Sequence, residues 1–182
     1  MTFEPDDDNR SILIIDDDPF IRKMLVDVLA DEYDCSSTSS AEEGLAVLGT
    51  REFALVISDI NMKGISGLEM VPRILALAPD TVVIMMSGEQ AIDNAVAAMR
   101  VGAFDYLTKP FNTEHVEAAV RRATDHYELR LAKRDYHVRL ERMVAEQPDS
   151  ELVPLAHALI ARINWAHGDA MGMMRAFTRM LG

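Results

Sequence analysis

Short apolar runs of strand length alternate with segments of helical periodicity over the first two thirds of the chain. Runs such as Ile12–Ile15 are apolar at every position, which is typical of strands buried on both faces. The predicted strands are residues 12–15, a weak polar strand at 34–38, 54–57, 81–86 and 103–107. The predicted helices are 19–29, 41–48, 67–78, 89–100 and a last one capped by Asn112 or Thr113. Five such strand–helix units predict a doubly wound α/β domain with a mainly parallel sheet.

The pattern changes after residue 124. Residues 125–147 continue the last helix as a heavily charged segment with a loose apolar seam at Leu129, Tyr136, Leu140 and Met143. Charged residues interrupt the heptad, so the sequence leaves a coiled-coil partner open. The predicted organisation is an acidic tail at 1–10, the α/β domain at 11–124, a linker helix at 125–147 and a small, Met-rich helical segment of unassigned role at 148–182.

Charge follows a similar division. Residues 1–112 carry 8 basic and 20 acidic side chains, which accounts for the whole net charge of −12, while residues 113–182 carry 10 of each. Because contacts to nucleic-acid phosphates need clustered Lys and Arg, this balance argues against nucleic acid as a partner. The single cysteine, Cys35, excludes an intramolecular disulfide, and no apolar run approaches the roughly 20 residues that span a bilayer. We expect a cytoplasmic protein with no membrane partner.

Chemically active side chains stand at the ends of the predicted strands. Asp16 and Asp17 follow the first strand, Asp59 the third, Ser87 the fourth and Lys109 the fifth. Because the carboxyl ends of parallel strands meet at one edge, we expect these residues to converge. Clustered carboxylates repel one another unless a cation neutralises them, and hard oxygen ligands suit Mg²⁺. With a lysine and a hydroxyl for phosphoryl oxygens, the set predicts phosphoryl transfer onto an aspartate.

Four segments together resemble a known family. Residues 12–19 (ILIIDDDP), 55–59 (LVISD), 86–88 (MSG) and 104–110 (FDYLTKP) are similar to the receiver domain of bacterial two-component response regulators. The resemblance covers about residues 10–124, and the joint spacing is far more specific than any single motif. It implies a flavodoxin-like receiver fold with five parallel strands in the order 2-1-3-4-5, followed here by a helical C-terminal extension.

The resemblance also implies roles for individual residues. Asp59 would accept a phosphoryl group from a histidine kinase or a phosphotransfer protein. Asp16, Asp17, Asp59 and the backbone carbonyl of Asn61 would hold Mg²⁺ as the cofactor. Such a protein is a signalling switch rather than an enzyme, because its only chemistry is its own phosphorylation and dephosphorylation.

Switching is implied by the same family pattern. Ser87 would be the switch hydroxyl, Lys109 the phosphate-contacting cation and Tyr106 an aromatic side chain that rotates inward on activation; the Lys109–Pro110 bond would be cis. Phosphorylation would then change a dimer or partner-binding face. A homodimer and a downstream protein bound through residues 125–182 are the expected partners.

Two other functions are compatible with parts of the sequence. A haloacid dehalogenase-like phosphohydrolase would use Asp16 as its nucleophile with Asp18 as the acid, but it needs a further strand ending in acids after Lys109, where only helical patterns follow. A DNA-binding transcriptional regulator would use residues 125–182 as its DNA-reading module, but the neutral charge of this part of the chain argues against it.

The remaining polar residues receive structural interpretations. Asp18 is predicted to be a helix N-terminal residue, favoured by the helix dipole, rather than a metal ligand. The histidines show no metal-ligand spacing and are predicted to lie at the surface: His115, His126, His137, His157 and His167. The methionines at 171–180 predict packing rather than a metal site.

Overall fold

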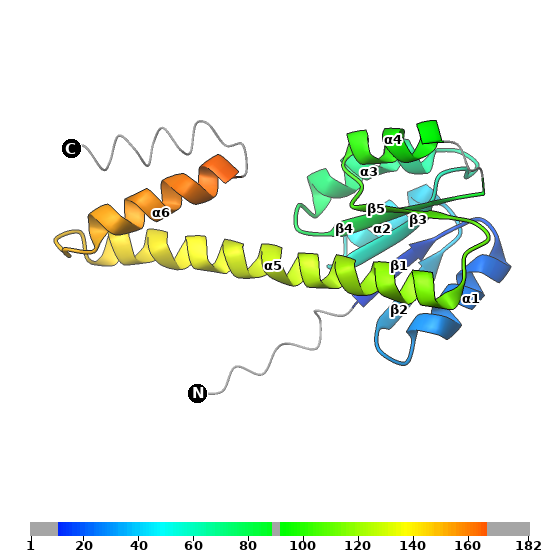
Figure 1. Ribbon diagram of the computed structural model, residues 1–182, viewed down its shortest axis with the longest axis horizontal. Coiled ribbons are helices and arrows are strands. Elements are labelled where there is room, and N and C mark those ends of the chain that lie inside the picture. Colours follow the sequence, from blue (N-terminus) through cyan, green and yellow to red (C-terminus); the bar gives the residue numbers. More distant parts are fainter. Residues whose placement is uncertain (1–10, 89–91, 167–182) are drawn as a thin grey trace. The chain divides into compact units, whose positions relative to one another are not determined.

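The computed structural model describes residues 11–88 and 92–166, in a chain that divides into two compact units, Met1–Glu128 and Leu129–Gly182. In the first unit, strands and helices alternate as predicted (Figure 1). The strands are β1 (Ser11–Ile15), β2 (Asp34–Thr38), β3 (Leu55–Asp59), β4 (Val82–Ser87) and β5 (Asp105–Thr108). The helices are α1 (Pro19–Leu29), α2 (Ala41–Leu48), α3 (Gly67–Leu77), α4 (Ile92–Val101) and α5 (Thr113–Glu146).

The five strands form one parallel sheet in the order β2-β1-β3-β4-β5, which confirms the predicted fold. The three central strands β1, β3 and β4 are buried along their whole length, whereas both edge strands are partly exposed. This is why β1, β3 and β4 are the continuous apolar runs, while β2 is polar: its side chains face water on part of their surface.

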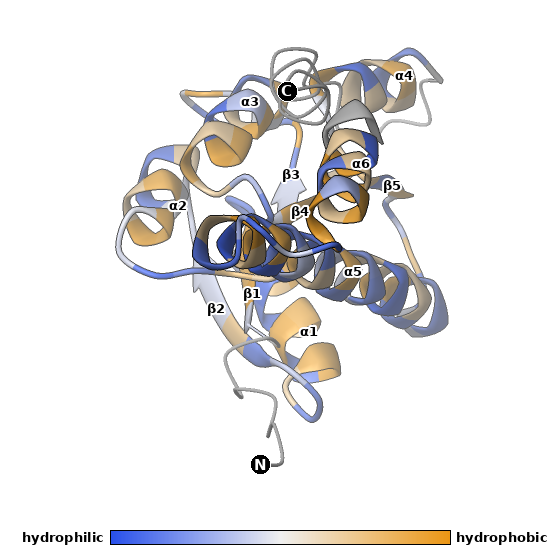
Figure 2. Cartoon of the chain, turned by 90° about the vertical axis from the view of Figure 1, so that its left-hand side faces the viewer, coloured by the Kyte–Doolittle hydropathy of each residue, from blue (hydrophilic) through white to orange (hydrophobic). Residues whose placement is uncertain are grey.

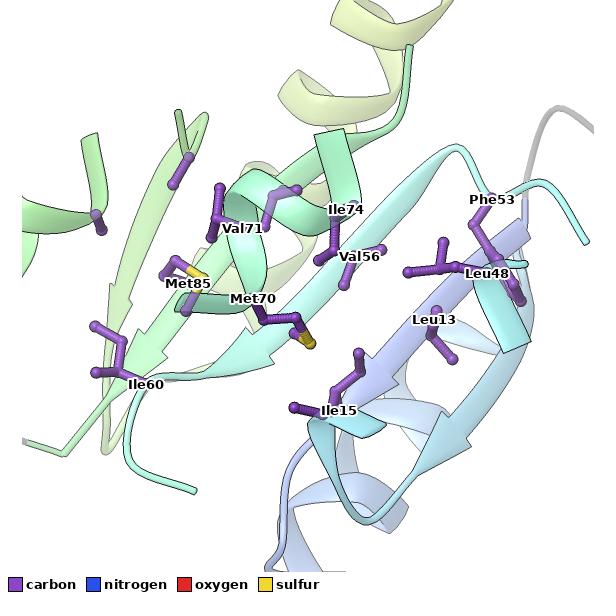
Figure 3. Packing of buried hydrophobic residues seen from close by; sticks show 14 residues of the cluster. Leu13, Ile15, Leu48, Phe53, Val56, Ile60, Met70, Val71, Ile74 and Met85 are labelled. Carbon is purple, nitrogen blue, oxygen red and sulfur yellow. The ribbon is translucent and has the colours of Figure 1, made fainter. Parts of the chain in front are cut away.

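The core between the sheet and α2 and α3 is continuous (Figure 3). Leu13 and Ile15 of β1 point to the same face, because alternate residues of a strand share a face. They pack with Val56 of β3, and Met70 and Ile74 of α3 cover the same cluster. At roughly 1.5–3 kcal/mol for each fully buried large apolar side chain, this layer is a principal source of the domain's stability.

Element boundaries differ from the predicted ones by one or two residues. Strand β3 extends to Asp59, and β5 begins at Asp105 rather than at residue 103. Helix α3 ends at Leu77 because Ala78 precedes Pro79 and has left the helical conformation, with φ −135° and ψ 82°. The predicted start of α4 at residue 89 lies outside the described residues.

Helix caps follow the sequence signals. The Ser40 hydroxyl accepts a hydrogen bond from the Glu43 amide at 3.2 Å, as expected of an N-cap. At the start of α5 the Asn112 side chain accepts from the His115 amide at 2.8 Å, so Asn112 rather than Thr113 is the cap. Asp18 caps α1 by accepting from the Phe20 amide at 2.8 Å, and Pro19 occupies the first turn.

The second unit contains the rest of α5 and α6 (Val153–Ala166). Leu140 of α5 and Ala156 and Ile160 of α6 form a small core, and much of α5 is otherwise hydrophilic (Figure 2). Residues 147–150 break the helix as predicted. The predicted helical continuation to residue 180 and its methionines lie outside the described residues.

The surface prediction is wrong for His157, which is only 6% exposed. It is the neighbour in α6 of Ala156, which belongs to the small core. His115 is exposed as predicted, whereas His126 is half-buried and stacks on Phe104 with 4.8 Å between the ring centroids. His167 is outside the described residues.

Candidate functional site

Strand register brings the predicted site residues to one edge of the sheet. Asp16 directly follows β1, Asp59 and Ser87 are the last residues of β3 and β4, and Lys109 directly follows β5. Ile15 is paired with Ser58, and Asp59 with Met86, so neighbouring strands end within one residue of each other. The loops leaving these ends therefore converge at the carboxyl edge of the sheet.

Lys109 joins two buried carboxylates at the centre of this edge. Its Nζ atom lies 2.6 Å from Asp16 Oδ2 and 2.8 Å from Asp59 Oδ1. The Asp16 side chain is 1% exposed and that of Asp59 7%. Asp17 is exposed at the rim, and one carboxylate oxygen from each of Asp16, Asp17 and Asp59 lies within 4.8 Å of the others. The structure thus brings together all three predicted acids and the predicted lysine.

Backbone amides hold the free oxygens of the two buried acids. The Asp18 amide donates to Asp16 Oδ1 at 2.9 Å, and the Asn61 amide donates to Asp59 Oδ2 at 3.0 Å. The Lys109 amide donates to the Ser87 carbonyl at 2.8 Å, which ties the lysine-bearing loop to the end of β4. Hydrogen bonds to charged acceptors are the stronger ones, so the carboxylates are oriented before any ligand binds.

The backbone of Asp59 is packed against the start of α3. The Gly67 amide donates to the Ile60 carbonyl at 3.0 Å, and a Cβ atom on Gly67 would lie only 2.1 Å from the Asp59 carbonyl oxygen. Only glycine therefore fits at position 67 without displacing Asp59.

Burial and pairing raise two pKa values at the site, for different reasons. Burial raises the pKa of the Asp16 carboxyl, and the hydrogen bonds from Lys109 and the Asp18 amide offset this only in part. Burial alone would lower the pKa of Lys109, but the hydrogen bonds and charges of Asp16 and Asp59 outweigh it and raise that pKa. The Lys109 ammonium is therefore stabilised by the two acids that it joins.

The other predicted site residues are Ser87, Tyr106 and Asn61, and they differ in burial. Ser87 is fully buried at the end of β4, and Tyr106 on β5 is half-buried against the hydrophobic core. The Lys109–Pro110 peptide bond is cis, as the resemblance implied. Asn61 is exposed, and its backbone amide donates a hydrogen bond to Asp59.

Sequence reasoning missed one residue at this edge. The Arg22 guanidinium on α1 donates from Nη1 to the backbone carbonyl of Asp16 at 2.6 Å. A signal was present, because an arginine in the first turns of the helix that follows Asp16 can reach back to the loop before it.

Comparison with known proteins agrees with this geometry. A family model for the response regulator receiver domain matches residues 12–121. The C4-dicarboxylate transport transcriptional regulatory protein DctD of Rhizobium meliloti is 40% identical over 116 residues, which are 63% of this chain and 25% of that protein. The DNA-binding transcriptional regulator NtrC of Salmonella typhimurium is 36% identical over 128 residues, 70% of this chain and 27% of that protein.

Solved structures show the same fold. A CheY-like receiver domain protein from Methanospirillum hungatei is 29% identical with a TM-score of 0.63, over 66% of this chain and 98% of that one. The beryllofluoride-activated NtrC4 receiver domain dimer is 28% identical with a TM-score of 0.62, over 64% of this chain and 98% of that one.

The chain belongs to the response regulator receiver domain family. Receiver domains are the phosphorylation-dependent switches of two-component systems, work with histidine kinases and bind Mg²⁺ at their acidic pocket, which here is the cluster of Asp16, Asp17 and Asp59. The chain spans about a quarter of the length of the two regulators named above. Among the residues that the structure describes, no helix is long and apolar enough to cross a membrane.

Proposed function

We propose that Asp59 is the phosphoacceptor of this receiver domain. The observation that carries the proposal is the placement of its carboxylate: it is almost fully buried, bound on one oxygen by Lys109 and on the other by the Asn61 amide, and adjacent to two further acids. In the transfer, a bond forms between an Asp59 oxygen and phosphorus while the bond from phosphorus to the donor nitrogen of a kinase phosphohistidine breaks. Catalysis is then mainly positioning and charge stabilisation.

The acidic cluster fits Mg²⁺ by its chemistry. Its carboxylate oxygens lie within 4.8 Å of one another, and one of them, from Asp17, is exposed and open to a hydrated ion. Asp16, Asp17 and Asp59 would hold the ion together with the Asn61 carbonyl. The bound ion would supply positive charge beside the incoming phosphoryl oxygens. After the transfer, the Lys109 ammonium would contact the negatively charged phosphoryl group instead of the Asp59 carboxylate.

Replacing Asp17 with Ala tests the metal site, because Asp17 is exposed and its loss leaves the buried pair with Lys109 intact. We expect the Mg²⁺ affinity, measured by isothermal titration calorimetry, to fall by at least about 10-fold, since one charged oxygen ligand of a hard cation is lost. Asp27→Ala on the exposed face of α1 removes the same charge away from the cluster and is expected to bind Mg²⁺ like the parent. Equal affinities in the two variants would contradict the assignment.

The switch proposal assigns the response to Ser87 and Tyr106. Ser87 donates to a phosphoryl oxygen after transfer, and Tyr106 moves into the space that it leaves. What supports this is that Ser87 ends the strand next to Asp59, while Tyr106 is half-buried on the adjoining strand. Such a movement repacks the face formed by α4, β5 and α5 and biases the equilibrium of a partner or a second copy.

A homodimer is the assembly that this switch is proposed to control, and it gives a second prediction. Beryllofluoride is the activating agent in the NtrC4 receiver dimer. Added here together with Mg²⁺, it is expected to raise the weight-average sedimentation coefficient of the full chain. Asp59→Asn should abolish the increase. Identical sedimentation with and without beryllofluoride would remove dimerisation from the proposal.

The output is proposed to be a downstream protein bound through residues 125–182. Relatives such as NtrC are DNA-binding regulators, but the family match ends at residue 121, and residues 113–182 have no excess of positive charge. The dehalogenase-like alternative is not favoured either, because the described residues from 113 to 166 contain helices and no further strand. The proposed role is therefore a switch whose only chemistry is its own phosphorylation and dephosphorylation.

A further inference from the structure

Arg22 contacts the site from a helix to which the proposed chemistry assigns no role. Its Nη1 atom lies 2.6 Å from the Asp16 carbonyl oxygen, and its side chain is half-buried on α1. The Arg22 amide itself donates to the Asp18 carbonyl at 3.2 Å as part of the first turn of that helix. The guanidinium and the backbone amide of Arg22 are thus both hydrogen-bonded to the loop that carries Asp16 and Asp17.

The contact completes the fixation of the β1–α1 loop. Asp16 is held at its amide by the Thr38 carbonyl, at one carboxylate oxygen by Lys109 and at the other by the Asp18 amide. Its carbonyl is the remaining polar group of the residue, and Arg22 takes it. That carbonyl belongs to the peptide unit joining Asp16 to Asp17, so its direction sets the orientation of the Asp17 backbone.

We propose that Arg22 is a positioning residue of the phosphoryl-transfer site: by binding the Asp16 carbonyl it orients the peptide unit from which the Asp17 carboxylate reaches Mg²⁺. The inference rests on the proposed metal role of Asp17. Groups that orient metal ligands without touching the metal typically change affinity by about 10- to 100-fold when they are removed.

The position of the guanidinium supports a fixed placement. Its charge reaches the Glu43 carboxylate at the start of α2, whose pKa is lowered first by hydrogen bonds from Ser39 and to a smaller extent by Arg22. The contact that fixes the guanidinium is its hydrogen bond to the Asp16 carbonyl. A planar guanidinium loses less freedom per hydrogen bond than the ammonium of lysine would, which suits this role.

Charge and positioning make opposite predictions for Mg²⁺ binding. Removing a positive charge near an acidic cluster by itself strengthens the binding of a cation. Removing a positioning contact weakens it. We therefore expect Arg22→Ala to bind Mg²⁺ about 10-fold more weakly than the parent in calorimetry on the full chain. The neighbouring Lys23→Ala removes the same charge from an exposed position and is expected to bind Mg²⁺ as tightly as the parent or slightly more tightly.

Arg22→Lys decides the matter even if Arg22→Ala fails to fold, because it keeps the charge and loses the guanidinium geometry. If Arg22 is a positioning residue, the Mg²⁺ affinity of Arg22→Lys should lie between those of the parent and Arg22→Ala. If Arg22→Ala does not fold, the Mg²⁺ affinity of Arg22→Lys should lie clearly below that of the parent. Parent-like affinity in Arg22→Lys, or binding by Arg22→Ala that is as tight as that of the parent, would overturn the proposal.

A metal-free readout separates this inference from the assignment of Asp17. The Asp18 amide donates to Asp16 within the same loop, so its hydrogen exchange, followed by NMR in the absence of Mg²⁺, is expected to speed up in Arg22→Ala and not in Lys23→Ala. If Asp17→Ala leaves Mg²⁺ binding unchanged, the metal assignment fails, yet faster exchange still supports loop positioning. Unchanged exchange in Arg22→Ala would contradict the inference whatever Asp17 does.

Discussion

Asp59→Asn is expected to eliminate labelling of the chain by radiolabelled acetyl phosphate in the presence of Mg²⁺. The substitution keeps the shape of the side chain and an oxygen that can accept hydrogen bonds, but an amide is not a nucleophile toward phosphorus. The Asp59 carboxylate is buried between Lys109 and the Asn61 amide, and the proposal assigns the attacking oxygen to this side chain alone. The measurement is protein-bound label after removal of the free donor.

Two companion variants make the result specific. Asp27→Asn changes an exposed carboxylate on α1 and should label like the parent. Asp16→Asn should reduce labelling through weaker Mg²⁺ binding without abolishing the acceptor. Persistent label in Asp59→Asn, together with its loss in Asp16→Asn, would transfer the acceptor role to Asp16 and revive the phosphohydrolase alternative.

Lys109→Met is expected to lower the free energy of unfolding of the Mg²⁺-free protein by about 3 kcal/mol at neutral pH. Removing one partner of a buried ion pair typically costs about 3–5 kcal/mol, and the lower end applies because 19% of the lysine side chain is exposed. Two buried carboxylates then face each other without a counter-charge. Urea denaturation of parent and variant in a chelating buffer measures the difference, with exposed Lys133→Met as the control.

Metal and pH give this prediction a distinctive signature. Mg²⁺ should stabilise Lys109→Met more than the parent, because the ion restores the missing positive charge. The folded-state pKa of Lys109 is raised above its ordinary value of 10.5, so its stabilising contribution is fully present below pH 10.5 and is lost as the pH rises further, through the raised pKa. The advantage of the parent over the variant should therefore shrink only in strongly alkaline buffer. Equal stability at neutral pH would refute the prediction.

The fold could be predicted from the sequence because its signals are local and redundant. Continuous apolar strands, capped helices and punctuating prolines agree with one another, and chain direction alone then places Asp16, Asp59 and Lys109 at one edge. The strand order and the individual residue roles came from resemblance instead, because the pairing of distant strands leaves no local trace in a single sequence.

Residues that act through a backbone atom could not be predicted. An arginine in the first turns of α1 can reach the loop before the helix, but its bond ends on a carbonyl oxygen, a group that every residue carries, so the sequence does not identify the acceptor. The burial of His157 was predicted wrongly for a related reason. Burial on α6 depends on which face of the helix meets Leu140 and its neighbours. A short helix with apolar residues on several sides does not indicate that face from its sequence.

The hydrogen bond from the Gly67 amide to the Ile60 carbonyl joins the two ends of the loop that follows Asp59, the proposed phosphoacceptor. Side chains in a loop closed by such a hydrogen bond can be replaced without moving the two ends of the loop. A change in the length of the loop must break the hydrogen bond. Substitution of an exposed residue such as Lys63 is therefore expected to leave Asp59 in place, while insertion or deletion between residues 61 and 66 should disturb Asp59 itself. Surface substitutions within residues 62–66 are therefore expected to leave the proposed phosphorylation site intact, whereas changes at Asn61 are not.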